Sequence, residues 1–408
     1  MAKGYKKNKG HRCDHFDMDD TESIISSRTA MSDVMSDSIT EDFTFDNSLD
    51  KLVDDLYAKR SLTREGALVK LVDAFESSNL LPFVEDRCST ISHLFINSIK
   101  KGMTNESNLA CRAIGLLSFT MGGGSSSHEI MEEALPQLCK ILSDESDQSK
   151  IPEVVKCIAL VAFLGADDLD KTEMALEAIW KVIQPKSGYN VTTVNYKPPV
   201  VVAAINAWSF LLTTISTWRL NPENWIMHIS HLSTLLESDD RSMRMAVGEA
   251  IALCFELKLF VNMKAKVIAQ IDTLSCEASR KGANKKNLNE QRELFRKIWD
   301  YVMNGGNVEE TVKISSKKGT ILCISSWTKL IQLNFIRHFL RKGFLHHAQD
   351  NPLMREIFTF GVDKKENLPK RVKKINRSES EKKLYMMMKK ERKVAEARKQ
   401  SFFNDLMY

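Results

Sequence analysis

An unbroken series of helical apolar stripes constrains the fold of this chain more than any other feature of its sequence. Between residues 49 and 304, apolar residues recur at steps of three and four, beginning with Leu49, Leu52, Val53 and Leu56, which is the spacing of one buried helix face. Short breakers rich in Asp, Asn, Gly and Pro separate the stripes, and no convincing strand alternation interrupts them. The sequence therefore predicts one helix after another.

The spacing of these helices indicates a repeat architecture. About twelve helices over this range give about 42 residues per helix pair, which matches HEAT and armadillo arrays. A local signature agrees: Leu235–Asp240 looks like a helix end and turn, and the following helix carries the small residues Ala246 and Ala250. We predict an all-α fold, an armadillo/HEAT-like α-solenoid with a small helical C-terminal module and a basic terminal helix.

The remaining segments complete a four-part division of the chain. Residues 1–48 are predicted to be a disordered, acidic, Ser-rich arm, and residues 49–304 the helical repeat domain. Residues 305–362 form a C-terminal domain, in which the β-branched stretches 308–316 and 320–324 predict either a small hairpin or an extended arm. Residues 363–408 are expected to be a basic tail with a terminal helix.

The overall net charge of +5 hides a strong separation of charge along the sequence. Residues 13–55 contain thirteen Asp/Glu against two Lys/Arg, a net of −11, and residues 280–408 contain thirty Lys/Arg against fourteen Asp/Glu, a net of +16. A chain divided in this way indicates an interaction with a polyanion through its basic end. Whether the acidic arm masks the basic end stays open at this level.

Several classes of protein are disfavoured. The eight cysteines form no Cys-x-x-Cys pair, as expected in a reducing compartment. The uncharged stretch 198–218 is long enough to span a bilayer, but Asn206, Ser209, Thr213 and Ser216 draw a polar stripe along it. Such a stripe is typical of an amphipathic helix buried in protein, so no membrane association is expected.

Motifs for catalysis or metal binding are weak. Gly122–Ser127 lacks the Gly-Lys-Ser/Thr ending of a phosphate-binding loop and is interpreted as a loop between repeats. His346 and His347 have no ligand at zinc spacing and are assigned capping or packing roles. Cys323 and His338 suggest no oriented nucleophile and base. We expect no enzyme activity, no cofactor, no metal and no small-molecule substrate.

The basic tail is the constellation that indicates a mechanism. Residues 364–400 carry fifteen Lys/Arg against five acidic residues, a net of +10, spread around most of a predicted helix. This favours insertion into a polyanionic cleft over a membrane surface or a partner groove, although a solvated helix of mixed charge is the alternative. The predicted RNA- or ribosome-binding residues are Lys373, Lys374, Arg377, Lys382, Lys383, Lys389, Lys390, Arg392, Lys393, Arg398 and Lys399.

A second interpretation applies to part of this tail. Pro369 precedes a short basic run that fits a monopartite nuclear localisation signal, although such runs also occur by chance in basic tails. The residues of this predicted signal are Lys370, Arg371, Lys373 and Lys374.

The C-terminal part of the sequence carries a distinctive order of short motifs. It runs Lys-Gly-Thr, Ser-Trp, Gly-Phe, Gln-x-Asn and Arg-x-Ile-Phe, and it resembles the short C-terminal domain of the interferon-related developmental regulators; the helical region before it is similar to that family's larger domain. After Leu384-Tyr385 the tail departs from the family pattern. The residues that carry the resemblance are Lys318–Thr320, Ser326–Trp327, Gln332–Leu333, Gly343–Phe344, His347–Asn351 and Leu353–Phe358.

The resemblance implies a non-enzymatic regulator of gene expression with an armadillo-like fold. Members of the family are described as ribosome-binding repressors of translation and as transcriptional co-regulators. The charge of the tail favours a ribosome- or RNA-associated translational repressor, and the alternative is a nuclear co-repressor adaptor in growth and differentiation. Protein partners are expected on the solenoid surface, and the expected localisation is both cytoplasmic and nuclear.

Overall fold

The structure of the chain is a computed structural model that describes residues 47–144, 147–184, 196–277, 285–315, 320–362, 386–387 and 390. The described residues from Leu49 to Val362 belong to one compact unit. None of the helices in these ranges is long and apolar enough to cross a membrane.

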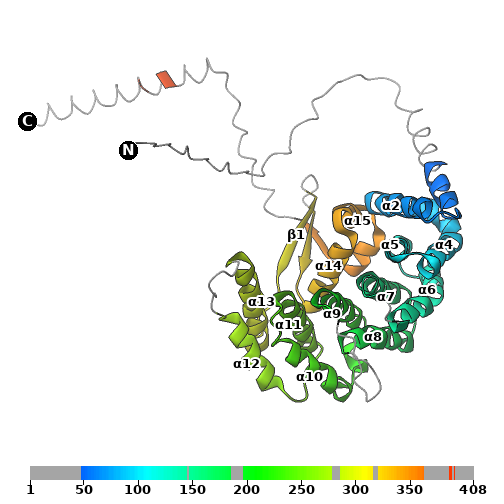
Figure 1. Cartoon of the computed structure of the whole chain (residues 1–408). Helices are drawn as coiled ribbons and strands as arrows, with labels where there is room; N and C mark the ends of the chain where they lie inside the picture. Colours follow the sequence, from blue (N-terminus) through cyan, green and yellow to red (C-terminus); the bar gives the residue numbers. More distant parts are fainter. Residues whose placement is uncertain are drawn as a thin grey trace, which may run out of the picture. The chain divides into compact units, whose positions relative to one another are not determined.

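Helices in two layers build most of the molecule (Figure 1). An inner row contacts itself in sequence order: α2 (Ser61–Ser77), α5 (Thr104–Met121), α7 (Ile151–Gly165), α9 (Pro198–Leu212), α11 (Arg241–Glu256) and α13 (Lys285–Asn304). An outer helix packs on each inner helix from α5 onward: α4 (Cys88–Lys101), α6 (Ser125–Asp144), α8 (Leu169–Ile183), α10 (Ile226–Leu235) and α12 (Lys264–Ser275). This is the predicted all-α solenoid, and the fold class is confirmed.

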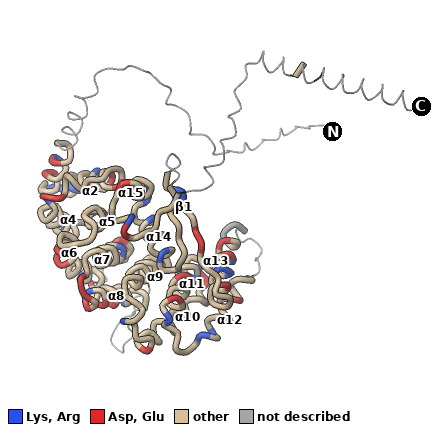
Figure 2. Tube along the Cα trace, turned by 180° about the vertical axis from the view of Figure 1, so that it is seen from behind, with Lys and Arg blue, Asp and Glu red and all other residues tan. Residues whose placement is uncertain are grey.

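The inner helices α5, α7, α9 and α11 are largely buried, because two inner neighbours and an outer helix contact each of them and α14 also packs on α9 and α11. Residues 110–120 of α5 are all buried, and α9 contains no charged residue. Figure 2 shows charged residues along the outer helices and on α13 at one end of the inner row. A helix that is apolar all round is expected only where protein surrounds it.

Side-chain hydrogen bonds to the backbone set several helix boundaries, and the sequence predicts some of these boundaries. The predicted breakers Asp168 and Asp240 act as N-caps, accepting from the backbone N–H of Lys171 and Met243 at 2.8 Å each. Helix α9 ends at Leu212 and not at Trp218, the end suggested by the uncharged run. The hydroxyls of Thr213 and Thr214 donate to the carbonyls three residues earlier at 2.6 and 2.7 Å, which stops the helical ladder.

A C-terminal module follows α13. Strands β1 (Glu310–Ser315), β2 (Thr320–Ile324) and β3 (Phe360–Val362) form an antiparallel sheet in that order. Between β2 and β3 lie α14 (Trp327–Leu340), η4 (Arg341–Gly343), α15 (Phe344–Asp350) and α16 (Pro352–Ile357). The hairpin is therefore present and the extended-arm alternative was wrong. The third strand was not predicted, so the module is mixed and not purely helical.

Candidate functional site

The C-terminal module lies along the inner row of helices. Helix α14 contacts α9 and α11, while η4 and α15 contact α2, and Figure 1 shows the module beside the inner helices. The contacts fall into three groups along α14, at its N-terminus, its middle and its C-terminal end. Together they join elements that lie far apart in the sequence.

The N-terminus of α14 is held by a carboxylate from α11. Glu256 accepts from the backbone N–H of Trp327 at 2.6 Å and of Thr328 at 3.0 Å, and it also accepts from the Thr328 hydroxyl. The first N–H groups of a helix have no partner within the helix and carry partial positive charge. A carboxylate placed there satisfies two of them and fixes where α14 begins.

The middle of α14 packs on α9 and the residue after it. The ring of Phe335 stacks on Phe210 with centroids 4.0 Å apart and an interplanar angle of 11°. The side-chain amide of Gln332 donates to the Thr213 hydroxyl at 2.9 Å. The hydroxyl that ends α9 is therefore also a docking contact for the module.

A buried ion pair anchors the C-terminal end of α14. Arg112 of α5 donates to Glu76 of α2 at 2.6 Å and to the Phe339 carbonyl at 2.7 Å. Both charged residues are less than 5% exposed. Because a buried charge is costly unless it is paired, this three-way contact fixes α2, α5 and α14 together. Gly343 completes the contact, since an added Cβ would lie 2.3 Å from the Glu76 carbonyl oxygen.

Two further motif residues bind backbone carbonyls of the solenoid. His347 is buried and contacts the Phe75 carbonyl through Nε2 at 2.8 Å, so Nε2 carries the proton; burial lowers the pKa of His347 and keeps the ring neutral. Asn351 donates to the Phe119 carbonyl at 3.2 Å. The packing role predicted for His347 is confirmed, and the short C-terminal motifs are explained as docking contacts.

The docked module changes where a partner can bind. The sequence suggested that the whole solenoid surface is available to protein partners. The structure shows that the chain's own C-terminal module covers part of the inner row between α2 and α11. The surface that the module leaves uncovered therefore includes the outer helices, the α14 flank and the N-terminal end of the row. The short C-terminal motifs were the sequence signal for this docking. Their pattern does not indicate which residues of the solenoid they contact.

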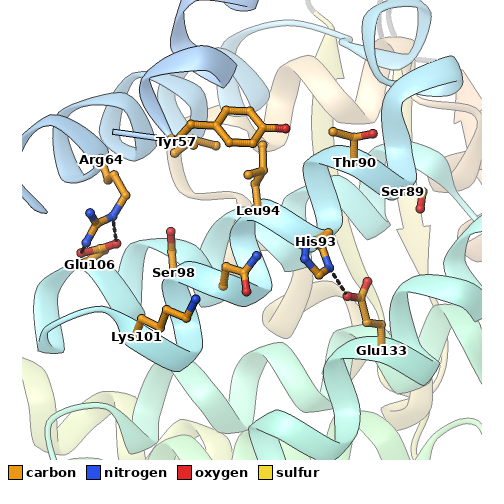
Figure 3. A pocket seen from close by; sticks show the side chains of 12 residues that line it. Tyr57, Arg64, Ser89, Thr90, His93, Leu94, Ser98, Lys101, Glu106 and Glu133 are labelled. Atoms are coloured by element: carbon orange, nitrogen blue, oxygen red, sulfur yellow. Dashed lines mark hydrogen bonds and ion pairs between the residues drawn. The ribbon is translucent and has the colours of Figure 1, made fainter. Parts of the chain in front are cut away.

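A pocket with a volume of about 780 Å³ lies at that N-terminal end. One face of α4 lines it throughout, with Ser89, His93, Asn97 and Lys101 recurring every four residues. Figure 3 shows Ser89, His93 and Lys101 along this helix. This polar stripe opposite the apolar face of α4 was the sequence signal that could have found the pocket.

Most of the charged side chains in this pocket are paired, Lys101 being the exception among the described lining residues. Arg64 binds Glu106 through two nitrogens at 2.6 and 2.8 Å, and Ser61 donates to the same carboxylate at 2.7 Å. Burial opposes ionisation, yet these hydrogen bonds prevail and lower the pKa of Glu106. His93 contacts Glu133 of α6 at 2.9 Å. These pairs connect helices, and the described residues place no hydroxyl nucleophile on His93.

Thiols and metal-ligating residues show the same structural use. Burial raises the pKa of Cys88 to about 11 and of Cys254 to about 12, and it raises the pKa of the fully buried Cys111 and Cys157. Where the chain is described, no three His, Cys, Asp or Glu side chains converge as a metal site would require.

Almost all residues of the predicted RNA-binding and nuclear-localisation sets lie outside the described residues, as does nearly all of the predicted acidic arm. Lys390 is the one described member, and it is helical and exposed, as are Met386 and Met387. The structure therefore brings none of these cations together with another predicted site residue.

The chain is similar to known proteins both in sequence and in structure. The sequence model of the interferon-related developmental regulator family matches residues 21–303. The mouse interferon-related developmental regulator 2 is 29% identical over 76% of this chain and 71% of its own length, and the human regulator 1 is 26% identical over 76% and 70%. Among solved structures, a designed armadillo repeat protein (17% identity, TM-score 0.43, 62% of this chain and 99% of that one) and an archaeal HEAT-like repeat protein from Thermococcus onnurineus (17%, 0.42, 64% and 92%) are similar.

The helical rows and the docked module define an armadillo/HEAT-like repeat scaffold. Within that class, the match over residues 21–303 covers more than half of the sequence. The chain belongs to the interferon-related developmental regulator family.

Proposed function

We propose that this chain is a non-enzymatic regulator of gene expression that binds the ribosome or structured RNA and represses translation. The observation that carries the proposal is the docked module, whose last described strand ends at Val362. The segment that follows, residues 364–400, carries fifteen Lys/Arg against five acidic residues. In the sequence, the basic tail therefore follows a module that buried contacts hold on the solenoid.

The physical basis of this proposal is counterion release. Each phosphate that a Lys or Arg neutralises frees condensed ions, so six contacts give a slope of about −4 in log affinity against log salt on the single-strand coefficient. A helix charged around most of its circumference suits a channel whose walls are phosphate on several sides. The solenoid would supply protein contacts beside that channel.

Sedimentation through sucrose gradients tests the proposal. The intact chain is expected to travel with ribosomes at low salt and to be released steeply as salt rises, and deletion of residues 376–408 is expected to abolish co-sedimentation. A matched pair of variants separates charge from shape: Lys382, Lys383, Lys389 and Lys390 changed to Ala should weaken binding, while the same positions changed to Arg should retain it. Unchanged sedimentation of the deletion variant would refute the role of the tail.

A nuclear co-regulator is the second candidate, and the run from Lys370 to Lys374 supports it. On this proposal the basic run directs nuclear import, so the protein is found in both cytoplasm and nucleus, and the solenoid binds a co-repressor or transcription factor. Reversing the charge of Lys370, Arg371, Lys373 and Lys374 should hold the protein in the cytoplasm. Nuclear entry of that variant would exclude the import signal.

A further inference from the structure

A groove beside α14 has polar chemistry that the docking of the module does not use. Its volume is about 280 Å³, and it lies between α14 and the inner helices α7, α9 and α11. At about 30 Å³ per water molecule in the liquid, this space suits one long side chain and excludes a helix. We call it the α14 groove; it is lined by Lys156, Ala203, Asn206, Ser209, Ala246, Glu249, Ile331, Asn334, Phe335 and His338.

Four polar side chains of the α14 groove lack partners within the described part of the chain. Asn206, Glu249 and Asn334 make no hydrogen bond or ion pair with another described residue, and the Ser209 hydroxyl is 3% exposed and also unpaired. Buried polar groups are normally satisfied, so the unpaired Ser209 hydroxyl is unusual, while Glu249 and Asn334 are half-buried and Asn206 is exposed. Three helices therefore direct unused hydrogen-bonding capacity into one groove.

The charge at one end of the groove selects for a cation. Glu249 is half-buried and is the only carboxylate in the lining, and the like charge of Glu310 adds to its burial in disfavouring ionisation. Glu310 is itself 3.8 Å from Arg337. At the other end, Lys156 is neutralised by Glu153 at 2.5 Å. Within this lining, Glu249 is therefore the acidic group without a direct partner among the described residues, and a cation bound beside it would favour its ionised form.

We propose that the α14 groove binds an extended peptide, with a Lys or Arg side chain of that peptide donating to Glu249. The apolar surfaces of Ile331 and Phe335 suit the methylene stem of such a side chain, whose charged end then reaches the carboxylate. Asn206 on α9 and Asn334 on α14 each offer an amide donor and acceptor, which match the N–H and C=O of a peptide unit. This site is separate from the basic tail, so it stands whether or not the tail binds RNA.

Methyl NMR of the full chain labelled at isoleucine tests the proposal, because Ile331 lines the groove. The probes are four nonapeptides of Gly and Ser that differ at the central residue: Arg, Gln, Glu or phosphoserine. The Arg peptide is expected to shift the Ile331 methyl signal with saturation below 5 mM, at least tenfold more tightly than the Gln peptide. Asn206→Ala, a change at an exposed position, is expected to weaken the Arg peptide about threefold.

Glu249→Gln is the decisive variant, and Glu293→Gln is its matched control on the exposed face of α13. Glu249→Gln should weaken the Arg peptide at least tenfold, and Glu293→Gln should leave its affinity unchanged. Equal affinity of the Arg peptide for both variants would overturn the proposal, as would the absence of any Ile331 shift. Preferential binding of the phosphoserine or Glu peptide would indicate instead an anion site at Lys156 and His338.

Discussion

Arg112 and Phe339 are 227 positions apart in the chain, and the Arg112 guanidinium donates to the Phe339 carbonyl oxygen at 2.7 Å. The same guanidinium lies 5.3 Å from the centre of the Phe339 ring and is paired with buried Glu76. One side chain therefore joins the first inner helices to the last long helix of the module. Gly343, His347 and Asn351 make further contacts between the module and the same helices.

Removing Arg112 should destabilise the chain strongly. Arg112→Ala leaves the Glu76 carboxylate buried without a partner, and breaking a buried pair in this way costs about 3–5 kcal/mol. Urea denaturation followed by circular dichroism measures the loss of free energy of unfolding. The control is Lys342→Ala, which removes the exposed pair with Asp73 and should cause no measurable change. A loss below 1 kcal/mol for Arg112→Ala would show that the pair does not anchor the module.

Gly343→Ala should displace the module from α2. The added Cβ would lie 2.3 Å from the backbone oxygen of Glu76, which cannot move away as a flexible side chain could. Overpacking of this kind costs about 1–3 kcal/mol. Gly123→Ala is the control, because nothing lies within 4 Å of its Cβ position. Limited proteolysis should cut the module faster in Gly343→Ala alone, and equal cutting of both variants would contradict the contact.

The repeat fold could be predicted because its signals are local. Apolar residues at helical spacing predict each helix. The breaker residues Asp168 and Asp240 are N-caps, and each accepts a hydrogen bond from the backbone N–H three residues later. The β1–β2 hairpin was predictable for the same reason. Strand β3 is three residues long and pairs with β2 from almost forty positions away, so no local pattern marks it.

The docking of the module could not be predicted because it depends on long-range pairing. Nothing in the sequence around Arg112 indicates that a carbonyl of α14 will lie beside it, and Glu256 lies 71 positions before the Trp327 N–H that it binds. The end of α9 at Thr213 depends on hydroxyls that compete with the helix ladder, which apolar periodicity does not show. The charges of the tail remain a prediction from the sequence.

Cysteine labelling should separate two classes of thiol. Cys276 and Cys323 are exposed and should react with iodoacetamide in the native state. Cys111, Cys157 and Cys254 are buried, and burial raises the pKa of each thiol, so little of the reactive thiolate forms. Mass spectrometry after a labelling pulse should find these three modified only above the urea midpoint. Their labelling in the absence of urea would contradict the packing of α5, α7 and α11.

The free energy of unfolding should depend on pH through the titration of Glu249. Burial, with Glu310 nearby, raises the pKa of Glu249 from 4.5 to about 7, so the folded chain holds a proton that the unfolded chain has lost. The protonated Glu249 side chain makes its full contribution to stability below pH 4.5. This contribution is lost as the pH rises through about 7. At 1.36 kcal/mol per pKa unit the loss is at most about 3 kcal/mol, and solvent contact of this half-buried group reduces it.

Replacing the carboxyl isolates this contribution from other titrating groups. Besides Glu310 on β1, the charged or titratable groups near Glu249 are Arg337 and His338 on α14 and Lys156 on α7, and none of them is changed in Glu249→Gln. The variant should therefore be more stable than the parent at pH 8 by about 1–2 kcal/mol and nearly equal to it at pH 5. Urea midpoints at the two pH values measure the difference. A variant that is less stable than the parent at pH 8 would mean that the carboxylate already has a partner within the folded chain.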